Sequence, residues 1–84
     1  MISTGIIEVD IHGMTANEAK SYIDKILKKV DRSVYRIRVI HGYHGGTSLK
    51  SMLTEEYSFE RSEKVKKIQG GNNPGITELV LREF

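Results

Sequence analysis

The sequence contains no cysteine. This absence excludes a disulfide framework, a thiolate metal site and a cysteine nucleophile. No apolar run approaches the roughly 18 residues that a membrane-spanning helix needs, so we expect no membrane segment. The first residues, MISTGIIEVD, lack the basic start and apolar core of a signal peptide, and we therefore expect a cytoplasmic protein.

The chain also has little excess of either charge. Its 13 basic and 11 acidic residues give a formal net charge of +2, which leans toward polyanionic partners without establishing them. With 84 residues the chain is long enough for one domain, over residues 1–84, and too short for a second. We expect residues 1–5 to be a loosely ordered N-terminus, and nothing indicates the oligomeric state.

The apolar pattern predicts six elements in the order β-α-β-α-β-β. Thr15 and Glu18 form a capping box at the start of the first helix, and Thr47 or Ser48 is expected to cap the second. Loops rich in glycine separate several of the elements, and GGNNPG is a turn by composition. The expected strands cover residues 6–11, 35–40, 65–69 and 76–84, and the expected helices cover 15–30 and 49–57.

This order predicts an α/β fold of the α+β kind. Strands separated by helices are expected to pair in parallel through right-handed crossovers, and the last two strands to form a hairpin. Each helix has a single apolar stripe, so both should cover one face of a four-stranded mixed sheet. The expected architecture is a two-layer sandwich.

Two His-Gly pairs follow the first two strands. His12 ends one strand and His41 ends the next, and ligands bind beyond the carboxyl ends of parallel strands. Asp10 points to the same side as His12 and can orient its ring, which makes Asp10, His12 and His41 a candidate acid/base set. The alternative is that each histidine is only a turn residue. The spacing matches no metal-ligand pattern, so we expect no dedicated metal site.

A glycine-rich loop leads from His41 into the second helix. Free amides at a helix start attract anions, and glycine lets a phosphate approach the backbone. The lysine of a nucleotide P-loop is absent, so a nucleic-acid phosphate is favoured over ATP. Lys50 in the first turn opposes the helix dipole and indicates a nearby anion, and Tyr43 could stack on a base; a plain turn is the alternative. The candidate phosphate-binding residues are Gly42, Tyr43, His44, Gly45, Gly46, Thr47, Ser48 and Lys50.

Arg36 and Arg38 alternate along the second strand and complete the candidate binding set. On an open sheet face they would form a basic strip, joined by Lys66 or Lys67 and by Arg82. The alternative is that these side chains are an ordinary solvated face.

The two histidine motifs together resemble the small MutS-related domain, called Smr. The first motif is VDIHG, residues 9–13, and the second begins with His41-Gly42-Tyr43. The closing segment PGITELVL also resembles the family, and the likeness runs from about residue 7 to residue 81. One difference is His44, which stands where the family has a glycine, unless the loop is one residue longer and Gly45 takes that place.

The resemblance implies a fold like the C-terminal domain of translation initiation factor three. It also implies DNA or RNA binding and, in several members, endonuclease or nicking activity. For such an activity we expect His12 to be the general acid or base, Asp10 to hold or charge it, and His41 to be its partner or to contact the phosphate. Many members are the tail of a larger protein, whereas this chain would be the domain almost alone. No cofactor is required by the sequence, and Mg²⁺ is left open because members differ in metal dependence.

Three functions are therefore compared. The first is an endonuclease or nicking nuclease that hydrolyses phosphodiester bonds. The second is a non-catalytic module that binds DNA or RNA in repair or ribosome-associated processes. The third is a protein-interaction domain that uses an exposed final strand.

Overall fold

The computed structural model describes residues 5–42, 46–58 and 64–82. The predicted order of elements is confirmed, and their bounds agree with the predicted ones to within a few residues. The strands and helices are β1 (Ile6–Asp10), α1 (Ala16–Lys29), β2 (Arg36–Ile40), α2 (Gly46–Glu56), β3 (Lys67–Gly70) and β4 (Ile76–Val80).

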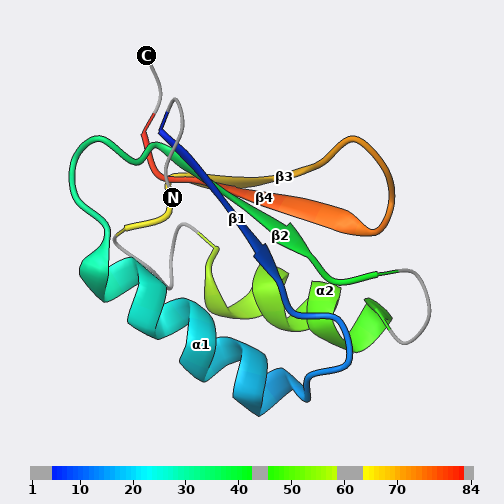
Figure 1. Cartoon of the computed structure of the whole chain (residues 1–84). Coiled ribbons are helices and arrows are strands. Elements are labelled where there is room, and N and C mark those ends of the chain that lie inside the picture. Colours follow the sequence, from blue (N-terminus) through cyan, green and yellow to red (C-terminus); the bar gives the residue numbers. More distant parts are fainter. Residues whose placement is uncertain (1–4, 43–45, 59–63, 83–84) are drawn as a thin grey trace.

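The four strands form one mixed sheet in the order β1-β2-β4-β3. β1 and β2 are parallel, whereas β4 runs antiparallel to both β2 and β3. Both helices lie on the same face of this sheet, which confirms the predicted two-layer sandwich (Figure 1). The final strand β4 lies between two others and is not an exposed edge. The predicted interaction through that strand is therefore wrong, because its backbone groups already pair on both sides.

The start of α1 is fixed by the predicted capping box. Thr15 Oγ1 accepts the Glu18 backbone N–H at 3.2 Å, and Glu18 Oε1 accepts the Thr15 N–H at 2.9 Å. These bonds satisfy two amides that the first helical turn leaves without partners. α1 then buries one stripe against the sheet, formed by Ala19, Ile23 and Leu27.

α2 begins earlier than its sequence indicated. It starts at Gly46, so Thr47 and Ser48 lie within the first turn. The prediction that one of them caps the helix is therefore wrong. The apolar stripe shows which face of a helix is buried but leaves its first residue open by a few positions. Lys50 consequently lies one turn inside the helix, where the dipole acts weakly. Its position therefore no longer indicates an anion.

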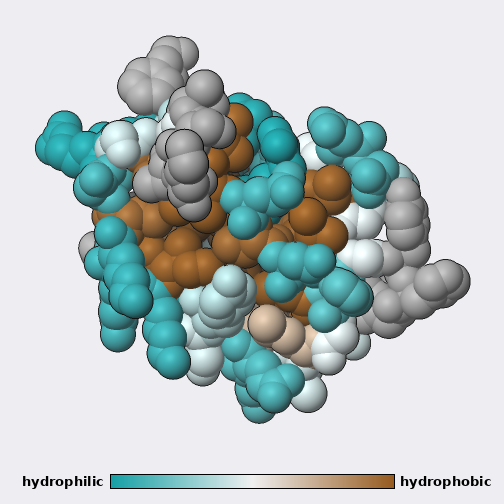
Figure 2. Space-filling view, viewed as in Figure 1, coloured by the Kyte–Doolittle hydropathy of each residue, from teal (hydrophilic) through white to brown (hydrophobic). Residues whose placement is uncertain are grey.

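The core lies between the sheet and the two helices. Alternate residues of the central strands, including Ile37, Val39 and Leu79, face the helices and are buried. Figure 2, in the same view as Figure 1, shows apolar side chains between the sheet and α1, with hydrophilic side chains around them. Within the described residues, neither helix has the length and apolar character that crossing a membrane requires.

Candidate functional site

Three turns meet at the carboxyl ends of β1 and β2. The Ile11 N–H donates to the Ile40 carbonyl at 2.9 Å, which continues the parallel pairing beyond β1. The N–H groups of His41 and Gly42 both donate to the Gly75 carbonyl, at 2.9 and 3.0 Å. The turn before β4 therefore holds the second His-Gly turn, and this contribution was not predicted from the sequence.

Gly42 lies directly beside His12. Its φ of +83° falls in the left-handed region, where glycine is favoured. A Cβ atom at position 42 would stand 3.6 Å from the Cβ of His12. The two His-Gly motifs thus come together at one edge of the sheet, as their positions after parallel strands predicted.

Asp10 and His12 form an exposed hydrogen-bonded pair. Asp10 Oδ1 accepts the ring N–H of His12 at Nδ1, 2.5 Å away, and the His12 backbone N–H at 3.0 Å. These two bonds, the ring bond first, lower the pKa of Asp10, so the carboxylate is ionised at neutral pH. Both side chains remain open to solvent, at 51% exposure for Asp10 and 71% for His12.

The pair fixes the orientation of the histidine ring. An ionised carboxylate only accepts hydrogen bonds, so the hydrogen must be on His12 Nδ1. In the neutral ring, Nε2 then carries a lone pair. Nε2 has no hydrogen-bond partner among the described residues, and a ligand in solvent can reach it. His12 can therefore accept a proton at Nε2, while the bond from Nδ1 to Asp10 fixes the ring.

His41 has the opposite environment. The residue is 2% exposed. Nδ1 lies 3.0 Å from the Gly42 carbonyl and Nε2 lies 2.8 Å from Thr77 Oγ1. Since a carbonyl only accepts, Nδ1 donates to it, and in the neutral ring Nε2 accepts from the Thr77 hydroxyl. Both ring nitrogens are thus occupied inside the fold.

The sequence predicted that both rings line one site, but only His12 faces solvent there. Alternate residues of a strand point to opposite faces. Residue 41 continues the buried positions of Ile37 and Val39, whereas residue 12 continues the exposed positions of Glu8 and Asp10. The same alternation in the sequence could have placed His41 inside.

The glycine-rich loop can be followed only in part. Tyr43, His44 and Gly45 lie outside the described residues, so their predicted phosphate contacts stay predictions. α2 begins at the next residue, and its N-terminus lies on the same side of the molecule as the turn after β1 (Figure 1). Ser48 and Lys50 are exposed along α2. The start of α2 and the turn after β1 thus lie at the same end of the molecule.

The predicted basic strip is neutralised. Arg36 Nη1 and Arg38 Nε each lie 3.1 Å from a carboxylate oxygen of Glu78, and Arg38 also approaches Glu8 at 3.6 Å. Gln69 donates to Glu78 as well, at 3.0 Å. Burial acts to raise the pKa of Glu78, but the bonds from Gln69 and Arg38 and the charge of Arg36 hold it below its ordinary value. Arg36 and Arg38 are therefore held by carboxylates, unlike the open strip that the alternation predicted.

Glu78 and Thr77 were missed by the sequence reasoning. Their neighbours in the last strand are apolar, and a Thr-Glu pair within ITELVL marks two polar groups in a buried element. Cross-strand pairing places Arg38 opposite Glu78 and Val39 opposite Thr77. The polar pair was visible in the sequence, but its partners required the register of β2 and β4.

The described residues contain no group of three or more histidine, cysteine, aspartate or glutamate side chains placed to hold a metal ion. Asp10 is the acidic side chain that adjoins His12. The chemical feature that the described residues show at this edge is an imidazole oriented by a carboxylate.

Comparison with known proteins relates this site to one family. The family described as Smr domain matches residues 9–75, a range that contains Asp10, His12, His41 and the Gly75 turn. The crystal structure of the Smr domain of Thermus thermophilus MutS2 is similar, with a TM-score of 0.76 and 26% sequence identity. That match covers 92% of this chain and 99% of the other. A comparison with curated proteins found no match.

Proposed function

This chain belongs to the Smr domain family, and from that membership and the site geometry we propose that it binds DNA or RNA and hydrolyses a phosphodiester bond. The family is a nucleic-acid-binding and nuclease-type module. The observation that carries the proposal is the exposed Asp10–His12 pair, in which Nε2 of the ring faces solvent. Such a nitrogen can exchange a proton with a reacting oxygen.

His12 is proposed as the general acid and base. Its Nε2 takes the proton of the attacking oxygen, the attacking oxygen bonds to phosphorus, and the bond from phosphorus to the leaving oxygen breaks. The imidazolium can then return the proton to the leaving oxygen. Asp10 supports this role because its ionised oxygen keeps the hydrogen on Nδ1 and stabilises the positive ring that forms.

The phosphate is proposed to lie between His12 and the start of α2. Gly42 leaves the space beside His12 without a side chain, and the α2 amides supply hydrogen-bond donors with a favourable dipole. His41 is proposed as a positioning residue rather than a catalytic one. Its bond to the Gly42 carbonyl holds the second turn, and its bond to Thr77 ties that turn to β4.

A cleavage assay tests the proposal. Labelled single- and double-stranded DNA and RNA are incubated with the wild-type chain, with His12→Ala and with Lys25→Ala, an exposed residue on α1 that serves as control. Each reaction is run with and without EDTA, which decides whether Mg²⁺ takes part. We expect His12→Ala to lose about 10²- to 10⁴-fold in rate and Lys25→Ala to match wild type. If purified His12→Ala cleaves at the wild-type rate, His12 takes no part in the reaction.

Binding without cleavage is the second candidate function. The observation in its favour is that His41 is buried, so that among the described residues His12 is the exposed histidine. The second ring of the predicted acid/base set is then not open to a substrate. In that case the wild-type chain binds nucleic acid but cuts none of the four substrates. Binding should weaken as salt rises, in proportion to the number of phosphates neutralised, and a salt-independent affinity contradicts both candidates.

A further inference from the structure

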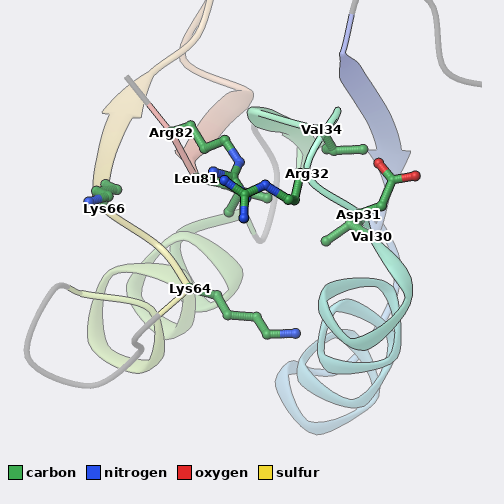
Figure 3. Close-up of a pocket in the computed structure, with 8 residues that line it drawn as sticks. All are labelled: Val30, Asp31, Arg32, Val34, Lys64, Lys66, Leu81 and Arg82. Carbon is green, nitrogen blue, oxygen red and sulfur yellow. The ribbon is translucent and has the colours of Figure 1, made fainter. Parts of the chain in front are cut away.

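A group of basic side chains, apart from Arg36 and Arg38, lies at the end of the sheet farthest from His12. A cavity of about 350 Å³ opens there between the end of α1, the segment before β3 and the segment after β4 (Figure 3). Its apolar lining comes from Val30, Val34 and Leu81. Lys66 and Arg82, which the sequence predicted to extend the basic strip, line this cavity instead.

Four basic side chains and one acidic side chain line the cavity. The basic ones are Arg32, Lys64, Lys66 and Arg82. Figure 3 shows the Arg32 and Arg82 side chains directed into the space between the sheet and α1. Two guanidinium groups that extend into one cavity repel each other unless an anion lies between them. The lining therefore favours a negatively charged ligand.

The carboxylate at the rim does not neutralise these cations. Asp31 Oδ1 accepts the N–H and the hydroxyl of Ser33, at 2.8 and 2.5 Å, and these bonds, that of the hydroxyl first, lower the pKa of Asp31. Asp31 forms no ion pair with any described residue. Lys64 is partly used, since its Nζ donates to the Leu27 carbonyl at the end of α1, 2.6 Å away.

The basic residues of the two regions differ in their partners. Arg36 and Arg38 on the open face are held by Glu78 and Glu8. Arg32, Lys66 and Arg82 form no ion pair with any described residue. Three basic side chains without an ion pair among the described residues therefore line one cavity.

We infer that this cavity is a second phosphate site, which holds a backbone phosphate of the bound nucleic acid away from the bond that is cut. The inference rests on the proposed nucleic-acid binding. A volume near 350 Å³ is at the small end of the range for ligand pockets, roughly 300–1,000 Å³, and suits one nucleotide unit. The apolar lining can receive part of a sugar or base, while Arg32 and Arg82 bind the phosphate as charge-assisted donors.

The spacing of the two sites fits one bound strand. Val34 at the cavity and His41 at the other end of β2 are separated by about 23 Å, from roughly 3.3 Å per residue along a strand. B-DNA places one phosphate per strand about every 3.4 Å of helix axis, so this distance corresponds to about seven base steps. The cavity would therefore position the strand while His12 acts on a distant phosphate.

The test compares two double variants in a His12→Ala background, which prevents cleavage. Arg32→Ala with Arg82→Ala removes two charges from the cavity, and Lys25→Ala with Lys28→Ala removes two charges from exposed positions of α1. Affinity for a labelled DNA or RNA strand is measured by fluorescence anisotropy over a range of salt. We expect the cavity variant to bind about tenfold more weakly and to lose about 1 to 2 in the salt slope, whereas the α1 variant changes less than about twofold.

Two further readouts separate the possible outcomes. Adenosine 5′-monophosphate, added to ¹⁵N-labelled protein, should shift the backbone amide signals of residues 32 and 82 in the His12→Ala parent but not those of the same positions in the cavity variant. The melting temperature of the cavity variant should stay level or rise, because the removed groups repel each other. Equal affinities for the two double variants overturn the second site but leave the proposed function standing. Failure of both the His12→Ala parent and the wild-type chain to bind any strand overturns the proposed function itself.

Discussion

His12 and His41 follow neighbouring parallel strands, and each is followed by glycine, yet their surroundings are opposite. His12 is mostly exposed and has one partner, the carboxylate of Asp10. His41 is buried and has two, the Gly42 carbonyl and the Thr77 hydroxyl. A buried polar group must have its hydrogen bonds satisfied, whereas an exposed one can leave a nitrogen open for chemistry. The same dipeptide therefore places a fully hydrogen-bonded ring inside the fold at one strand end, and an exposed ring with an open Nε2 at the other.

The largest expected effect on stability is that of His41→Ala. The change removes a buried ring and leaves the Thr77 hydroxyl without its partner, so the free energy of unfolding should fall by about 3 kcal/mol. Urea denaturation followed by circular dichroism measures the loss. His12→Ala is the matched variant and should change the free energy by less than about 0.5 kcal/mol, because its side chain is exposed. Equal losses for the two variants would contradict the comparison.

Glu78→Gln extends the comparison to a buried carboxylate. Removal of its charge leaves Arg36 and Arg38 without their shared counterion, which should cost about 2 kcal/mol at neutral pH. This is less than breaking a fully buried pair, since the arginine side chains are 30% and 27% exposed.

The pH dependence of the stability loss in Glu78→Gln distinguishes an effect of charge from an effect of packing. The folded-state pKa of Glu78 lies below its ordinary value of 4.5, so its stabilising charge is fully present above that value. The contribution is lost as the pH falls through the folded pKa. The stability difference between wild type and Glu78→Gln should therefore shrink below about pH 4.5. Glu55→Gln, an exposed carboxylate on α2, is the control, and a pH-independent difference would indicate packing instead.

These buried groups show where sequence reasoning succeeded and where it stopped. Local signals carried the fold: the capping box at Thr15, the apolar stripes and the alternation of β1 gave the six elements and the layers. The pairing of Asp10 with His12 was also predicted, because the two are close in sequence and on one face. The alternation of β2 also indicates that His41 points inward, contrary to the prediction that its ring lines the site.

The remaining features depend on contacts between distant segments. Glu78 meets Arg38 across 40 residues of sequence, and only the register of β2 against β4 makes them neighbours. Arg32 and Arg82 share a cavity because the turn after α1 and the end of β4 lie together. Periodicity and composition describe one segment at a time. They therefore cannot show which charges in different segments cancel and which converge.

Asp10→Asn tests the exposed side of the comparison. Asparagine keeps the shape but no longer holds the proton on His12 Nδ1 by charge, so the cleavage rate should fall roughly tenfold to a hundredfold. The lowered pKa of Asp10 keeps it ionised throughout the neutral range, so the loss should be similar from about pH 5 to pH 8. Glu8→Gln, on the same strand and face, is the matched control and should cut at nearly the wild-type rate. Similar losses in both variants would mean that general surface charge is responsible.

The smallest expected effect is that of Thr77→Val, which separates positioning from catalysis at His41. Valine keeps the volume of threonine but removes the hydroxyl that bonds His41 Nε2, so about 1 kcal/mol of stability should be lost. Thr77→Ser retains the hydroxyl and should recover most of that bond. If His41 only positions the turn, the cleavage rate of folded Thr77→Val stays near wild type and its pH profile is unchanged. A hundredfold rate loss without a stability change would instead bring His41 into the reaction, because a ring that exchanges protons depends on the partner of its second nitrogen.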